Sequence, residues 1–180
     1  QVIAATTDRA LNDTDARGMS ALLSACQQTQ PVAVQALLSR PEIDAVSAGP
    51  DQAAPIHYAT REPALQPMVP RLIERQADVN AVDGDGSTPL HSSLAAGAAA
   101  TAGQLLAAGG KVEAKLLSSG KTALHVAVST PSVAENAELL DQVIAATTDR
   151  ALNDTDARGM SALLSACQQT QPVAVQALLS

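Results

Sequence analysis

Three histidines stand at regular intervals and are the first candidates for chemistry. The interval from His57 to His91 equals the interval from His91 to His125. Imidazole serves as a metal ligand and as a general acid or base, so such a ladder could bind a metal or catalyse a reaction. A zinc site, however, needs three or four convergent ligands, and no cluster of Cys or His surrounds these positions. We therefore expect each histidine to order the start of a helix and the neighbouring turn through hydrogen bonds.

Two other groups of residues suggest chemistry only at first sight. Asp83-Gly84-Asp85-Gly86 resembles the start of a calcium loop, but Leu94 occupies the twelfth position, where an EF-hand needs Glu. We interpret it as a hairpin-like finger. Cys26 and Cys167 lie in short Leu- and Ala-rich segments, which favours buried apolar roles over nucleophiles. The sequence thus predicts no catalytic residue, no metal site and no cofactor, and the chain is not expected to be an enzyme.

The elements that carry these residues belong to a repeat within a repeat. Residues 1–39 recur letter for letter as residues 142–180, so the full unit spans residues 1–141. Within that unit, four-residue marks begin at positions 20, 54, 88 and 122, and the next begins at 161; three of them end in His57, His91 and His125. Each interval reads as a short apolar helix, a second helix with Leu pairs and an extended connection. Fixed periods of this length are typical of solenoid proteins.

The marks divide the chain into modules of one continuous solenoid. The expected boundaries are 1–19 (the second half of a module), 20–53, 54–87, 88–121, 122–160 (five residues longer) and 161–180 (the first part of the next module).

Local signals mark the helix ends. Ser132-Val133-Ala134-Glu135 has the pattern of a capping box and predicts the longest helix, through about Thr147. Pro67 suits a first helical turn, whereas Pro70 fits only if it still lies in that turn and otherwise kinks the helix. Gly109-Gly110 predicts a helix end.

The modules resemble ankyrin repeats. Residues 77–91, ADVNAVDGDGSTPLH, reproduce almost throughout the family's core motif ADVNA-x-D-x-x-G-x-TPLH, and residues 121–125, KTALH, are a weaker copy. The resemblance covers the whole chain and implies an all-α, ankyrin-type solenoid of helix-turn-helix modules with extended fingers. Stacks of the TPR or HEAT type are the alternative, but neither explains why marks of the TPLH kind recur at equal intervals.

The sequence also departs from the family pattern. Ala54 replaces the usual Thr, and Leu23 and Leu164 replace the usual His, so these modules lack part of the polar clip at the helix start. Residues 41–53 lack the usual Asp and Gly, which predicts an irregular finger there. The five extra residues of the module 122–160 fall between Thr130 and Leu140.

Composition excludes several classes of partner. The net charge is −7, which disfavours nucleic acids and anionic membranes. No apolar run approaches the roughly 20 residues of a spanning helix, so no membrane insertion is expected. With no Trp, no Phe and only Tyr58, the chain lacks the stacking platforms of single-strand binders. No disulfide framework or signal peptide is evident, which favours the cytoplasm.

The ankyrin resemblance implies that protein partners bind along the concave face, at the finger tips and first-helix edges. The predicted residues are Arg17, Met19, Gln27, Gln28, Asp51, Ala53, Arg61, Glu62, Asp85, Ser87, Ser119, Lys121, Ser129, Thr130, Arg158, Met160, Gln168 and Gln169.

Three functions are compatible with this interpretation. The first is a structural scaffold, a segment of a longer uncapped array matched to a filament or microtubule-type lattice in the cytoskeleton, a cilium or a flagellum. Four modules would advance roughly 32–40 Å, comparable to the subunit spacing of such polymers. The second is an adaptor that holds one partner on its concave face. The third is an ankyrin segment attached to an enzyme.

Overall fold

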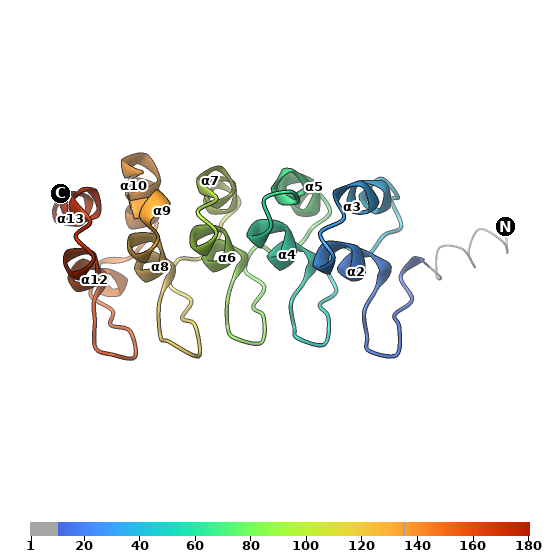
Figure 1. Ribbon diagram of the computed structural model, residues 1–180, viewed down its shortest axis with the longest axis horizontal. Coiled ribbons are helices and arrows are strands. Elements are labelled where there is room, and N and C mark those ends of the chain that lie inside the picture. Colours follow the sequence, from blue (N-terminus) through green and yellow to red (C-terminus); the bar gives the residue numbers. More distant parts are fainter. Residues whose placement is uncertain (1–10, 135) are drawn as a thin grey trace, which may run out of the picture.

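The chain folds as a single stack of helix pairs, with an extended finger preceding each pair (Figure 1). The computed structural model describes residues 11–134 and 136–180. Residues 1–10 of the first predicted module and Glu135 of the predicted capping box lie outside them. The described residues form helices and isolated bridges but no strand, which confirms the expected all-α solenoid.

Two rows of helices build the stack, as Figure 1 shows. The row next to the fingers, called here the inner row, consists of α2 (Ala21–Gln27), α4 (Pro55–Arg61), α6 (Pro89–Ala95), α8 (Ala123–Ser129) and α12 (Ala162–Gln168). The outer row consists of α3 (Pro31–Leu38), the 3-10 turn η1 (Gln66–Met68) with α5 (Val69–Glu74), α7 (Ala99–Ala107), α9 (Pro131–Ala134) with α10 (Ala137–Ala145), and α13 (Pro172–Leu179). A short helix, α11 (Asp149–Leu152), precedes the last finger.

The inner helices begin at the sequence marks, and three of them, α2, α6 and α12, are capped by the hydroxyl of the first mark residue. The hydroxyl of Ser20 accepts a hydrogen bond from the Leu23 N–H at 3.3 Å, and that of Thr88 accepts one from the His91 N–H at 3.4 Å. Pro89 follows Thr88 directly, where its missing N–H costs nothing. Seven-residue helices are too short to be stable alone, so these caps and the neighbouring pairs hold them in place.

The outer row confirms two of the predicted helix ends and corrects one. Pro70 lies in the first turn of α5. Because η1 ends at Met68, directly before α5 begins, no kinked helix forms. Gly109 follows α7 with φ of +88°. The single long helix predicted from Ser132 is wrong, because α9 ends at Ala134 and α10 begins anew with Asn136 as its N-cap. The Asn136 side chain accepts from the Leu139 N–H at 3.1 Å, and a capping residue of this kind starts a helix rather than continuing one.

The predicted irregular finger at residues 41–53 is in fact regular. The Gly49 N–H donates to the Ala53 carbonyl, and the Gln52 N–H donates to the Gly49 carbonyl, which is the pattern of the other tight turns. Gln52 achieves this with φ of +60°, where the other fingers have Gly18, Gly86 and Gly159. A residue with a Cβ is strained there by roughly 1 kcal/mol.

Small aliphatic side chains fill the core between the rows. Ala59, Ala102 and Ala127 are completely buried, and so are the larger anchors Leu90 and Leu105. Alanines allow helices to approach closely, which is how a chain almost without aromatics reaches a close-packed interior.

The two cysteines differ although their surrounding sequences are identical. Cys26 is buried, and burial raises the pKa of its thiol to about 12, as an apolar role requires. Cys167 is exposed, so the prediction of a buried role is wrong for that copy. The difference arises because a following module covers α2, whereas α12 lies at the end of the stack (Figure 1).

Candidate protein-binding groove

From the finger of residues 47–53 onward, neighbouring fingers are joined by backbone hydrogen bonds near their tips. In each bond, a residue of one finger accepts from an N–H of the next at 2.8–2.9 Å: Asp51 from Gly84, Asp85 from Leu117 and Ser119 from Ala157. The three accepting carbonyls are equally spaced in the sequence, so the bonds repeat with the modules. These four fingers therefore form a fixed row rather than independent loops.

Within a finger, a carboxylate organises the turn. Asp83 Oδ1 accepts from the N–H groups of Asp85 and Ser87 at 3.0 and 2.9 Å. Asp15 and Asp156 do the same in their own fingers, and these bonds hold the pKa of both carboxyls below the usual value. The Asp-Gly motif thus forms a turn, as predicted, and Asp83 Oδ1 is occupied by backbone donors.

The histidines connect each inner helix to the next finger. His57 Nδ1 accepts from the Ala54 N–H, and Nε2 lies 3.1 Å from the carbonyl oxygens of both Ala81 and Ser87. His125 Nε2 lies 2.9 Å from the Met160 carbonyl in the same way. An Nδ1 that accepts and an Nε2 that donates describe a neutral imidazole. This confirms the predicted hydrogen-bonding role at the helix start and the neighbouring turn.

Burial lowers the pKa of all three histidines and keeps the rings neutral. In His91, Nδ1 lies 2.9 Å from the Thr88 hydroxyl. Its buried Nε2 lacks a hydrogen bond of good geometry, although the carbonyls of Ala114 and Lys121 lie near enough to favour protonation. We assign His91 the same structural role in a looser form.

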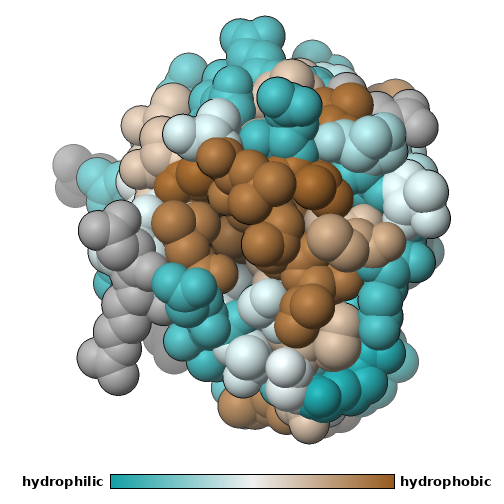
Figure 2. All heavy atoms as spheres, turned by 90° about the vertical axis from the view of Figure 1, so that its left-hand side faces the viewer, coloured by the Kyte–Doolittle hydropathy of each residue, from teal (hydrophilic) through white to brown (hydrophobic). Residues whose placement is uncertain are grey.

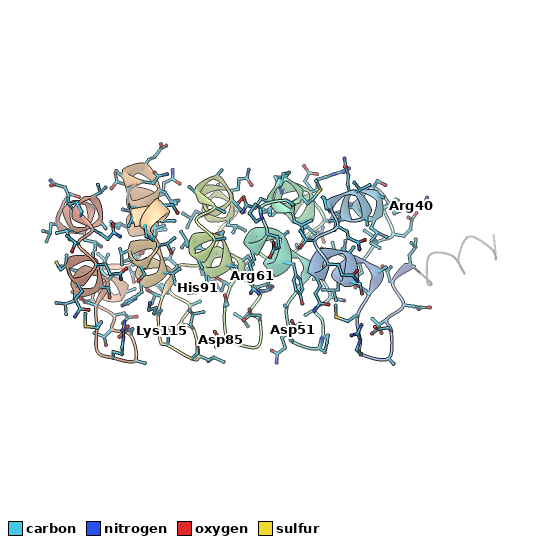
Figure 3. All side chains as sticks on the ribbon, viewed as in Figure 1. Arg40, Asp51, Arg61, Asp85, His91 and Lys115 are labelled. Atoms are coloured by element: carbon cyan, nitrogen blue, oxygen red, sulfur yellow. The ribbon has the colours of Figure 1, made fainter. Side chains whose placement is uncertain are left out.

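Between the fingers and the inner helices lies a groove, centred on the module that begins at Ala54. It contains two adjoining hollows of about 210 and 420 Å³, which share the side chains of Arg61, Asp83 and Asp85. Figure 3 shows Arg61 and His91 on the inner helices and Asp51 and Asp85 on the fingers below them. We call this space the finger groove.

The finger groove combines charged walls with an apolar floor. Leu116 and Val126 line the larger hollow. Arg61 pairs with Asp83 at 3.8 Å, and because the guanidinium is more than half exposed this ion pair is weak. The groove has three carboxylates, those of Asp51, Asp83 and Asp85, and one guanidinium, so its net charge is negative.

Tyr58, the chain's one aromatic residue, stands at the smaller hollow. Its hydroxyl donates to Asp51 Oδ2 at 2.9 Å. Partial burial and this carboxylate raise the pKa of the phenol to about 12. Tyrosine and arginine are among the residues most often responsible for binding energy at interfaces, so Tyr58 and Arg61 are the natural anchors for a partner.

The residues predicted from the sequence divide into three groups. Asp51, Ala53, Arg61, Asp85 and Ser87 line the finger groove and are brought together by the fold. The other exposed or half-exposed residues lie on other fingers and helix ends: Arg17, Gln27, Gln28, Glu62, Ser119, Lys121, Ser129, Thr130, Arg158, Met160, Gln168 and Gln169.

The third group consists of buried side chains, and Ala53 belongs to it as well as to the groove lining. Met19 and Ala53 are only 6% and 5% exposed, so their predicted role at finger tips must be corrected. Met19 lies against Gly49 of the next finger and offers a partner almost no surface. Sequence reasoning missed Tyr58 and Asp83. The rarity of aromatics could have pointed to Tyr58.

Two further features of the described residues bear on other functions. No group of three or more His, Cys, Asp or Glu residues within 11–134 and 136–180 is arranged to hold a metal ion. None of the helices described is long and apolar enough to cross a membrane.

Comparison with known families agrees with the fold. The family model for ankyrin repeats (3 copies) matches residues 56–141, which include the greater part of the finger groove. A comparison with curated proteins found no match.

Proposed function

Because the chain is an ankyrin-repeat protein, a module type that binds other proteins, we propose that it is a non-catalytic interaction scaffold whose finger groove holds a partner segment. The observation that carries the proposal is the groove itself, in which Tyr58 and Arg61 stand between fingers that are hydrogen-bonded to each other. A fixed groove loses little entropy on binding, and that favours affinity.

The charge of the groove indicates the chemistry of the partner. Three carboxylates face one partly exposed guanidinium, and Leu116 and Val126 offer an apolar floor. A segment with a Lys or Arg next to an aliphatic side chain matches both features. Such charge complementarity acts mainly on the association rate and on specificity.

The test is a quantitative pull-down followed by mass spectrometry, with matched charge reversals. Asp85→Lys reverses a charge inside the groove, whereas Glu74→Lys makes the same change at an exposed position at the end of α5. We expect Asp85→Lys to reduce capture of a specific partner about tenfold or more and Glu74→Lys to leave it unchanged. Equal capture by the Asp85→Lys variant and the unmodified chain would rule out the groove as the binding site.

A second, finer function is a structural array along a polymer, and the letter-for-letter recurrence of residues 1–39 at 142–180 favours it. Linked identical units gain avidity when their spacing matches that of the target. Co-sedimentation with assembled microtubules tests this proposal directly. Retention of the chain in the supernatant at saturating polymer would contradict it and leave the adaptor function.

A further inference from the structure

Three fingers contain the same carboxylate-centred turn, and two of them hold an arginine on that carboxylate. Asp15 and Asp156 occupy the place of Asp83 in their turns, five residues before the first residue of the next mark. Arg17 Nε and Nη2 donate to Asp15 Oδ2 at 3.3 and 3.2 Å. Arg158 makes the same two bonds to Asp156 Oδ2 at 3.4 and 3.3 Å. A guanidinium group is therefore the ligand that Oδ2 of this turn accepts elsewhere in the chain.

The turn that borders the finger groove, residues 83–87, lacks this arginine, and we call it the groove turn. Asp85 stands at the position that arginine occupies in the other two turns, so a second carboxylate replaces the guanidinium. Asp83 Oδ1 accepts the same two backbone hydrogen bonds as its counterparts, which holds the carboxylate in the same way. In the part of the chain that the structure describes, Asp83 forms one ion pair, with Arg61. The groove turn thus keeps the carboxylate of this arrangement without its own guanidinium.

Arg61 fills the vacant place only loosely. Its Nη2 lies 3.8 Å from Asp83 Oδ2, which is beyond hydrogen-bond distance, whereas the arginines of the other two turns approach to 3.2 and 3.3 Å. The Arg61 side chain reaches over from α4 and is 55% exposed, so this ion pair is weak and open to displacement. The Asp83 side chain, in contrast, is only 12% exposed. A carboxylate that is largely removed from water gains from a closer cationic partner.

The hydrogen bonds of the other carboxylates show which oxygens of the groove are available to a partner. Asp51 Oδ1 accepts from a backbone N–H at 3.2 Å and its Oδ2 accepts from the Tyr58 hydroxyl at 2.9 Å, so both oxygens are engaged. Asp85 Oδ2 accepts from the Ser118 hydroxyl at 3.1 Å, and within the described residues no donor bonds to its Oδ1. The available oxygens are therefore Asp83 Oδ2 and Asp85 Oδ1. Both belong to the groove turn, whose two carboxylates line both hollows.

We propose that the groove turn is an arginine-selective subsite, in which a guanidinium group of the partner takes the place that Arg17 and Arg158 fill in their own turns and displaces Arg61. The inference rests on the proposed function and narrows it, because it selects arginine over lysine. In the filled turns, two N–H groups of one guanidinium converge on a single carboxylate oxygen. The planar guanidinium presents these donors in a fixed geometry, whereas the ammonium of lysine acts as a point charge.

The test titrates two probes of equal charge, acetyl-leucyl-arginine amide and acetyl-leucyl-lysine amide, into the full chain. The readout is the NMR shift of the Asp85 and Ser87 N–H groups, which bond to Asp83 Oδ1. The N–H groups of Arg158 and Met160 make the same bonds in a turn that already holds its arginine, so they are the internal control. Because the shifts are resolved by residue, contacts of the probe leucine with the apolar area at the α12–α13 end (Figure 2) are distinguished from binding in the groove.

We expect the arginine probe to shift the two groove signals with an affinity at least about fivefold above that of the lysine probe, while the control signals stay in place. Arg61→Gln removes the loose occupant and should raise the affinity for the arginine probe about threefold. Asp85→Arg restores the arrangement of the other two turns and should lower that affinity at least about tenfold. Glu74→Arg makes the same change of charge at an exposed position at the end of α5 and should leave it within about twofold.

Equal affinities for the two probes would overturn the arginine-selective subsite, and so would the absence of any shift in the groove signals. Weaker binding of the arginine probe to the Arg61→Gln chain would also overturn it, because Arg61 would then assist the ligand instead of occupying its place. None of these results would remove the groove as the binding site for a partner. That function is tested separately by the pull-down with Asp85→Lys, so the two proposals can fail independently.

Discussion

The two identical copies allow one leucine deletion to be measured against its own control. Leu38 is 1% exposed at the end of α3, whereas its copy Leu179 is 70% exposed at the end of α13. Leu38→Ala and Leu179→Ala change the same residue in the same local sequence. The preceding residues of the two helices are identical, so the difference reports chiefly the burial of the leucine.

The expected magnitudes follow from the exposed fractions. Leu→Ala removes about three carbon groups at about 0.8 kcal/mol each when they are fully buried, or roughly 2.4 kcal/mol. The unfilled cavity raises the cost for Leu38 to about 3–4 kcal/mol. Leu179 has only a minor part of its surface buried, so its removal should cost less than about 1 kcal/mol.

Urea denaturation followed by far-UV circular dichroism measures both variants. With a slope near about 2 kcal/mol per molar urea, Leu38→Ala should lower the midpoint by roughly 1.5–2 M and Leu179→Ala by less than about 0.5 M. Unchanged slopes would show that the comparison is valid. Equal midpoint shifts in the two variants would mean that residues 40–75 do not cover α3, and the packing of the stack as described would be wrong.

Three further predictions concern the histidines, the strained turn and the core. The folded pKa of each buried histidine lies below its unfolded value, so as the pH falls the unfolded chain binds the proton first. The free energy of unfolding should therefore be largest above about pH 7 and should fall below pH 6.5 by up to about 1.4 kcal/mol per pH unit for each histidine. A urea midpoint that stays constant between about pH 7 and 5 would contradict the neutral assignment of His57, His91 and His125. Gln52→Gly should raise the free energy of unfolding by roughly 1 kcal/mol because φ is +60° there, whereas a loss of stability in thermal melts would show that the side chain is not strained. Leu90→Asp places a charge at a fully buried site and should unfold its module and weaken both neighbours at a cost above about 4 kcal/mol; a cooperative melt at the original temperature would show that Leu90 is not core.

The sequence was sufficient for the fold because the ankyrin motif is local and repeated. The marks ending in His57, His91 and His125 predict both the helix starts and the hydrogen-bonding role of the rings, and the structure agrees. Capping depends on residues three positions apart, which is a distance that a sequence displays directly. The same reasoning failed at Ser132, where a matching pattern lies inside a short helix and Asn136 starts the next one.

The candidate site and other contacts between modules were harder to predict. The finger groove brings Asp51 of one module next to Arg61 and Asp85 of the following module. Arg75 and its acceptor Leu38 are far apart in the sequence, and no local pattern marks the pair. Burial of Met19 likewise results from the approach of Gly49 in the next finger. Cys167 shows the limit most clearly, because its sequence is that of Cys26 and only the neighbouring module decides its exposure.

The two substitutions that weaken the family pattern make physical sense together. Leu23 removes the imidazole that would donate to the next finger, and Pro50 removes the N–H that would tie that finger back. The two bonds use different groups, because the imidazole of His57 lies against carbonyls of the next finger whereas the Gly84 N–H donates to a carbonyl of the preceding finger. At this junction Gly49 packs against the apolar side chains of Met19 and Leu23 instead. Since the later modules keep their histidines, the junction after residues 20–39 differs in its contacts from the three that follow it.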